Sequence, residues 1–127
     1  MPHMIFPKLL AAAVLSAVAA TAATAHHGWS WAEADQIELT GTIRSISFAP
    51  PHPTLEVEAE DGLWRLELGN PNQTQRSGFV EGEAEVGDTI RALGNRSMDP
   101  GERRMKAVRI TVGDKTYDIY PDRIQSK

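Results

Sequence analysis

The sequence predicts an all-β fold with little helix, an OB-like Greek-key barrel of five to six strands with a short helix between the third and fourth strands. Two observations lead to this prediction. Short segments of alternating apolar residues are separated by turn signals such as Asp61-Gly62, which is typical of antiparallel strands. A single helix start, Asn70-Pro71, lies between the third and fourth segments. A β-sandwich is the alternative, but it would explain neither this helix nor a bent first strand.

The first three segments predict an antiparallel meander. The first strand is expected over residues 37–48. Its apolar residues change face after Ile43, which predicts a β-bulge near Arg44-Ser45, and Gly41 permits a sharp bend. The alternating apolar residues of the second and third strands are Leu55, Val57, Ala59, Trp64, Leu66 and Leu68.

The second half of the chain supplies the helix and the remaining strands. Asn70 suits the N-cap, and Gly78 suits the position just after the helix end. Phe79 and Val80 follow the helix and are expected to plug one end of the barrel. The fourth strand is expected over residues 89–93, a loop over 94–104, the fifth strand over 105–112 and a sixth strand around 117–119.

The N-terminus has the features of a secretory signal peptide. Lys8 is followed by the apolar run 9–20 and by the small-residue cleavage signal Ala23-Thr24-Ala25. We therefore expect cleavage after Ala25 and a periplasmic protein with three parts: signal peptide 1–25, leader 26–36 and barrel domain 37–127. The apolar run is short for a membrane span, so no stable membrane insertion is expected after cleavage.

Composition narrows the function classes. The chain of 127 residues has a net charge of −4 at pH 7 and no cysteine. An acidic exported domain is a poor partner for nucleic acid, and thiolate ligands and disulfides are excluded. No nucleophile elbow, phosphate-binding glycine loop or His-x-x-x-His pair is present, so the sequence predicts a small binding protein and not an enzyme. It leaves the oligomeric state open.

Three histidines follow the cleavage site and form the candidate metal ligands. Cleavage after Ala25 would leave His26 with a free α-amine, so that the amine and the ring could chelate one metal ion, with His27 beside it. His52, in a proline-rich loop, is the third candidate. Nitrogen donors favour Cu(II) as the cofactor. His26 and His52 can meet only if the leader doubles back or the curvature of the barrel brings the two ends of the first strand together. Otherwise His26 and His27 form one site, and His52 stands alone or joins a second subunit. Trp29 and Trp31 are expected to shield the metal site.

A metal-free envelope module is the second hypothesis, in which the loops between strands 1 and 2 and strands 4 and 5 bind another envelope protein or a glycan. The second of these loops carries Arg96, Met98, Arg103 and Arg104, and its arginines could clamp carboxylates of a partner. The acidic residues of the second and third strands are expected on the solvated barrel exterior. These are Glu56, Glu58, Glu60 and Glu67.

Several motifs together resemble an uncharacterised family of small exported bacterial proteins, described only as a domain of unknown function. The resemblance implies an exported barrel and no established activity. This chain has Pro50 where that family typically has Asn. A looser similarity, in the N-terminal histidine alone, connects the chain with periplasmic copper carriers. The motifs are His26-His27-Gly28-Trp29, Thr40-Gly41-Thr42-Ile43, Pro51-His52, Asp61-Gly62 with Trp64, Gly87-Asp88 and Asp99-Pro100-Gly101.

Overall fold

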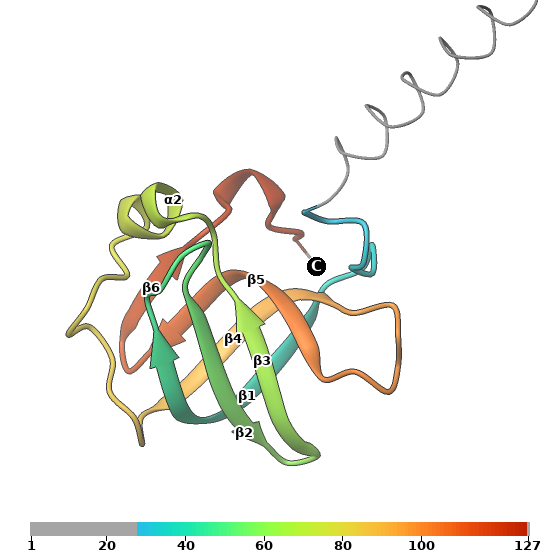
Figure 1. Cartoon of the computed structure of the whole chain (residues 1–127), viewed down its shortest axis with the longest axis horizontal. Helices are drawn as coiled ribbons and strands as arrows, with labels where there is room; N and C mark the ends of the chain where they lie inside the picture. The colour runs from blue at the N-terminus through green and yellow to red at the C-terminus, as the bar shows by residue number, and fades with distance from the viewer. Residues whose placement is uncertain (1–27, 127) are drawn as a thin grey trace, which may run out of the picture. The chain divides into compact units, whose positions relative to one another are not determined.

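The computed structural model describes residues 28–126, and its fold lies in one compact unit, Trp31–Lys127. Of the other unit, Met1–Ser30, only the turn at residues 28–30 is described. The elements of the compact unit, in chain order, are β1 (Ile37–Ser47), β2 (Thr54–Ala59), β3 (Gly62–Glu67), α2 (Pro71–Arg76), β4 (Thr89–Arg96), β5 (Arg104–Val112), β6 (Lys115–Asp118) and the short 3-10 helix η1 (Pro121–Arg123) (Figure 1).

Five strands close into a mixed barrel, and β6 extends the sheet beyond β5 (Figure 1). The strands follow the order β3-β2-β1-β4-β5-β6, and a further pairing joins β3 to β5. This closing pair is parallel, whereas the other pairs are antiparallel. The predicted OB-like barrel, with its β1–β2–β3 meander and its helix before β4, is confirmed.

β1 pairs with two different strands because it is bent and bulged. Its first half pairs with β4 and its second half with β2, and the register against β2 shifts between Ile43 and Ser45. The predicted bulge is therefore confirmed, with Arg44 as the extra residue. A Cβ on Gly41 would overlap the backbone oxygen of Glu58 and lie 2.7 Å from Cγ1 of Val57, so only glycine lets β2 approach so closely.

The barrel is filled by apolar side chains from all of its strands and from the segment after α2. Phe79 is buried, lies 5.7 Å from the Phe48 ring and meets the Tyr117 ring edge-on at 5.3 Å between ring centroids. It therefore closes the core as predicted. Val80 does not, because its side chain faces out and the residue is 39% exposed. The remaining core residues include Leu39, Ile43, Leu55, Val57, Trp64, Leu66, Leu68, Ile90, Met105 and Ile110.

β4 is three residues longer than the sequence predicts, and it ends at Arg96 rather than residue 93. Gly94 explains the difference. The register between β4 and β5 shifts between Leu93 and Gly94, and the strand continues beyond the shift. A Cβ at Gly94 would overlap the backbone oxygen of Lys106. The glycine therefore permits β4 and β5 to pair where the sequence predicts a loop.

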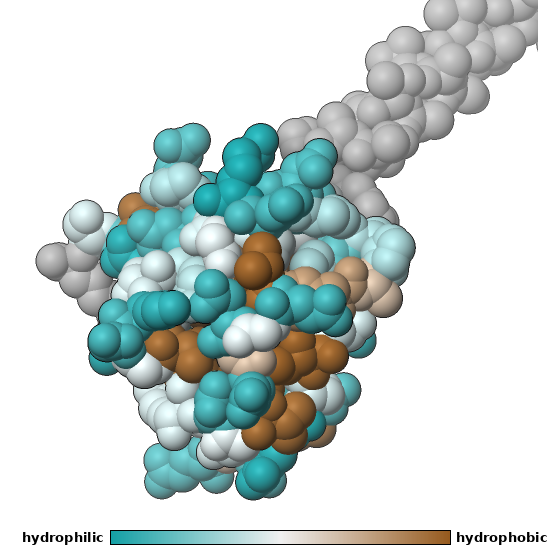
Figure 2. Space-filling view, turned by 90° about the vertical axis from the view of Figure 1, so that its left-hand side faces the viewer, coloured by the Kyte–Doolittle hydropathy of each residue, from teal (hydrophilic) through white to brown (hydrophobic). Residues whose placement is uncertain are grey.

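The described surface carries exposed apolar residues among hydrophilic ones. On the face shown in Figure 2, brown apolar patches lie between teal and white residues. In the part of the chain that the structure describes, none of the helices has the length and apolar character needed to cross a membrane. The large apolar residues that are exposed are Leu63, Val80, Val86 and Met98.

Candidate functional site

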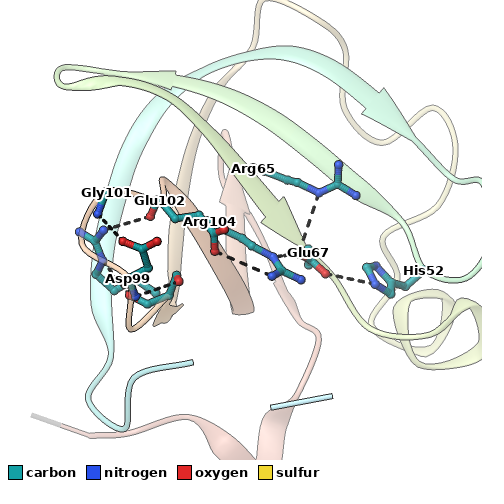
Figure 3. Close-up of polar contacts among 9 residues, drawn as sticks. His52, Arg65, Glu67, Asp99, Gly101, Glu102 and Arg104 are labelled. Carbon is teal, nitrogen blue, oxygen red and sulfur yellow. Dashed lines mark hydrogen bonds and ion pairs between the residues drawn. The ribbon is translucent and has the colours of Figure 1, made fainter. Parts of the chain in front are cut away.

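Glu67, the last residue of β3, is a buried carboxylate with charged side chains around it. Its side chain is 5% exposed. Two arginines and a histidine face its carboxylate (Figure 3). Nε of Arg104 donates to Oε2, Nε2 of His52 lies 3.2 Å from Oε1, and Nε of Arg65 lies 3.9 Å from Oε2. We call these four residues, His52, Arg65, Glu67 and Arg104, the Glu67 cluster.

Backbone pairing brings the Glu67 cluster together. The parallel seam of the barrel pairs Arg65 with Arg104 and Glu67 with Lys106. The loop between β1 and β2 is tied to the end of β3, because the backbone amide of Leu68 donates to the carbonyl of Pro53 at 3.0 Å. The cluster therefore lies where the closing seam meets the β1–β2 loop. The β1–β2 loop contributes His52, whereas Arg104, predicted as the end of the second loop, is the first residue of β5.

The charges of the cluster stabilise an ionised Glu67. Burial alone would raise the pKa of this carboxyl, but the hydrogen bond and charge of Arg104 outweigh burial and hold the pKa below its usual 4.5. The same hydrogen bond raises the pKa of Arg104. With Arg65 and the buried Lys106 nearby, positive groups outnumber the single carboxylate at this seam of an acidic protein.

The end of the leader also belongs to this region. The Trp31 ring stacks on Arg104, with 3.7 Å between its centroid and Cζ of the arginine, so Arg104 lies between Trp31 and Glu67. The carbonyl of Trp31 accepts from the amide of Met98 at 2.9 Å, and the amide of Glu33 donates to the carbonyl of Arg96 at 2.7 Å. Residues 31–33 therefore continue the antiparallel pairing of β1 with β4 past the end of the strand.

The expected position of Glu67 on a solvated face is wrong. Its side chain alternates with that of the buried Leu66, as predicted, but Arg104 of β5 and His52 of the β1–β2 loop contact its carboxylate and the residue is buried. A local alternation pattern cannot show which outward residues a nonlocal strand will bury.

The other residues predicted for the β4–β5 loop do not join the cluster. Arg96 donates to the backbone carbonyls of Pro100 at 3.3 Å and Glu102 at 3.1 Å, so it closes its own loop. Nε of Arg103 lies 3.5 Å from Oδ2 of Asp61. Met98 is 55% exposed and contributes only its backbone amide to the leader contact.

His26 and His27 lie outside the described residues, and Trp29 lies in the turn at the start of the described chain. Of the predicted metal ligands, His52 is therefore the one that the structure places. Its Nδ1 is buried and has no hydrogen-bond partner among residues 28–126. Within residues 28–126, no group of three or more histidine, aspartate or glutamate side chains is arranged to hold a metal ion.

Sequence reasoning missed Glu67, Arg65 and Lys106, although one signal pointed to Glu67. The predicted hairpin turn at Asp61-Gly62 fixes the register of β2 against β3, and this register pairs Thr54 with Glu67. His52 precedes Thr54 by two residues, so the hairpin alone places the histidine near the end of β3. The contribution of β5 had no such local signal.

A family of unknown function, DUF6152, matches residues 13–107. The chain belongs to this family. No curated protein matches the chain.

The family match confirms the resemblance to an uncharacterised family, and it covers the whole Glu67 cluster together with Lys106. It ends inside β5 and does not include β6. Since the family description assigns no activity, the function has to be argued from the chemistry of the site.

Lys106 provides a prediction about pH. Burial lowers the pKa of this amine below its usual 10.5, although Glu67 opposes the shift. At a pH between the pKa of Lys106 in the folded protein and that in the unfolded chain, the unfolded chain binds more protons. The free energy of unfolding of the wild type therefore rises with pH in this range. We expect the free energy of unfolding to rise in the wild type relative to Lys106→Met as pH approaches 10.5.

Urea unfolding at neutral pH and near pH 10.5 would measure this difference. Lys115→Met serves as the control for loss of a lysine whose side chain is 65% exposed. An identical change with pH in the wild type and in Lys106→Met would contradict the prediction.

Proposed function

We propose that this protein is a small periplasmic Cu(II)-binding protein in which a free N-terminal His26 chelates the metal, with His27 and His52 as further nitrogen ligands. The observation that supports the proposal most directly is the state of His52. In the part of the chain that the structure describes, Nδ1 of its ring is buried without a hydrogen-bond partner, while Nε2 lies 3.2 Å from Glu67.

A buried ring nitrogen without a partner costs free energy unless a donor, a water or an ion completes it. Histidines that bind metals commonly present one ring nitrogen to the ion and the other to a carboxylate, which is the arrangement of His52 and Glu67. Imidazole suits Cu(II), which also heads the affinity order of the divalent first-row metals. His52 therefore has the chemistry of a prepared nitrogen ligand.

Glu67 itself is a poor candidate for a ligand. Its Oε2 accepts from Arg104, and Arg65 and Lys106 add further positive charge on the seam. These charges oppose a cation at the carboxylate. Nδ1 is the other ring nitrogen of His52 and does not face Glu67. The metal would therefore be bound by the imidazole ring and not by the Glu67 carboxylate.

The leader supports the same proposal. Residues 31–33 lie beside the end of β4, and Trp31 stacks on the arginine that contacts Glu67. His27 precedes Trp31 by four residues in the chain. A first-position histidine offers an α-amine and a ring nitrogen, both of which can lose a proton near neutral pH when a metal competes.

A Cu(II) titration of the processed protein tests this function, by calorimetry with spin-resonance spectra. We expect one-to-one binding that weakens by about 100-fold, or about 2.8 kcal/mol, when one residue is added ahead of His26. His52→Ala should weaken binding and remove one nitrogen from the spectrum. A form with one residue added after Lys127 is the control. Equal affinity in the two N-terminal forms would refute the proposal.

The excess of positive charge around Glu67 favours a second candidate function. In this function the protein is a metal-free envelope module that binds carboxylates of a protein partner. Arg65 is 59% exposed and its closest acidic atom, on Glu67, is 3.9 Å away. Arginine forks suit bidentate carboxylate recognition. This function would be indifferent to the residue added ahead of His26.

A polyglutamate peptide is the probe for this candidate. In NMR spectra, addition of the peptide should shift the side-chain signals of Arg65 and Arg104. The affinity for the peptide should fall in Arg103→Ala and Arg104→Ala. Arg44→Ala, which removes an exposed arginine from the Glu58 ion pair, is the control. Equal binding by all variants would count against this candidate.

A further inference from the structure

We infer that Glu67 is a positioning residue that fixes the ring proton of His52 on Nε2 and so makes Nδ1 the nitrogen that binds metal. This inference deepens the proposed Cu(II) function and rests on it for the identity of the metal. Its structural part, the choice of tautomer, concerns the protein without metal and is tested separately.

The two neutral forms of His52 differ sharply in this environment. With the proton on Nε2, an N–H faces a carboxylate oxygen 3.2 Å away, within the range of N–H···O contacts. With the proton on Nδ1, a lone pair on Nε2 would face that carboxylate, and the N–H on Nδ1 would be buried without an acceptor. The second form suffers both charge repulsion and an unsatisfied donor. Glu67 therefore selects the Nε2–H form.

The selected form leaves one electron pair on Nδ1 with no partner in the described structure. A ligand nitrogen must be unprotonated, so the Nε2–H form is ready to bind without a proton shift. A carboxylate on the opposite nitrogen also raises the basicity of the ligand and fixes the plane of the ring. Glu67 thus supplies orientation and electron density while making no bond to the metal.

Glu67 can act in this way because it is itself held. Arg104 occupies Oε2, which leaves Oε1 for His52, and Trp31 stacks on the other side of the Arg104 guanidinium. The backbone on either side of Glu67 is fixed by the pairing of β3 with β2 and with β5. The carboxylate cannot turn toward another partner without breaking the arginine contact.

Nitrogen-15 NMR of the metal-free wild type tests the tautomer directly. We expect the Nδ1 signal of His52 at the position of an unprotonated ring nitrogen and the Nε2 signal at that of a protonated one. In Glu67→Gln the amide can either accept from or donate to Nε2, so the two tautomers should become mixed. Glu58→Gln is the matched control, because Glu58 pairs with Arg44 at 2.7 Å and not with His52.

Copper affinity then tests the consequence. Glu67→Gln should weaken Cu(II) binding by about 10–100-fold, the usual cost of losing a carboxylate that orients a metal-binding histidine. Glu58→Gln should bind as the wild type does. In the background of His52→Ala, Glu67→Gln should have no further effect, since Glu67 acts only through that ring.

The outcomes separate this inference from the function beneath it. If wild-type His52 carries its proton on Nδ1, the inference is overturned whatever the copper result. If the tautomer is Nε2–H but Glu67→Gln binds Cu(II) as tightly as the wild type, the positioning role is overturned while the Cu(II) function stands. If wild-type binding does not depend on a free His26 amine, the proposed function fails, and the tautomer measurement still decides the role of Glu67 in the metal-free protein.

Discussion

Phe79→Ala is expected to lower the free energy of unfolding by about 3–5 kcal/mol, the usual cost of deleting a fully buried aromatic ring. Phe79 is 1% exposed and lies between the Phe48 ring at the end of β1 and the Tyr117 ring of β6. Its removal would leave a cavity at the end of the barrel and break two aromatic contacts at once. Urea unfolding followed by tryptophan fluorescence measures the change.

Val80→Ala is the matched control for this experiment. It truncates the next residue of the same segment, but Val80 is 39% exposed and contributes little to the core. Its effect should stay within about 0.5 kcal/mol. A small loss in Phe79→Ala, similar to that of Val80→Ala, would mean that Phe79 does not close the barrel.

Features that depend on near neighbours in the chain could be predicted from the sequence. The helix start is one example: Asn70 accepts from the amide of Gln73 at 2.8 Å, and Gly78 adopts a φ of 93° just after the helix. The bulge at Arg44 is another, because the change of face along β1 is written in its own apolar pattern. Each of these features is decided within a few residues.

The candidate site was predicted only in part, since it depends on contacts between distant segments. His52 could be singled out by residue type, and Arg104 by its loop. Their meeting point at Glu67 requires the parallel seam between β3 and β5, which closes a long stretch of chain. Parallel pairing leaves no turn signal in the sequence, so the sequence alone predicts a solvated carboxylate at a position that the fold buries.

The leader shows the same limit. Its contacts with the barrel include the bridge between Ala32 and Ser97, the backbone hydrogen bonds of Trp31 and Glu33, and the stack of Trp31 on Arg104. The leader has no apolar period from which a pairing partner could be predicted. The alternating tryptophans predict anchoring or shielding without naming a partner. In the structure, Trp31 stacks on Arg104, which donates a hydrogen bond to Glu67.

Gly94→Ala is expected to destabilise the protein by about 3 kcal/mol, at the upper end of overpacking costs. Gly94 has ordinary backbone angles, so the cost comes from space alone. A Cβ there would overlap the backbone oxygen of Lys106 and lie 2.7 Å from Cγ of Met105. A backbone oxygen in a strand cannot move aside as a flexible side chain can, and β4 and β5 would have to separate.

The position of Gly94 gives this substitution a second effect. Lys106 is the register partner of Glu67 across the seam, so a shift of its backbone would disturb the carboxylate that faces His52. We expect Gly94→Ala to broaden the NMR signals of His52 as well as to lower stability. Gly101→Ala is the control, because a Cβ there would lie 3.4 Å from Oδ1 of Asp99, in ordinary contact. Equal stability of the two variants would show that the β4–β5 seam tolerates a side chain at Gly94.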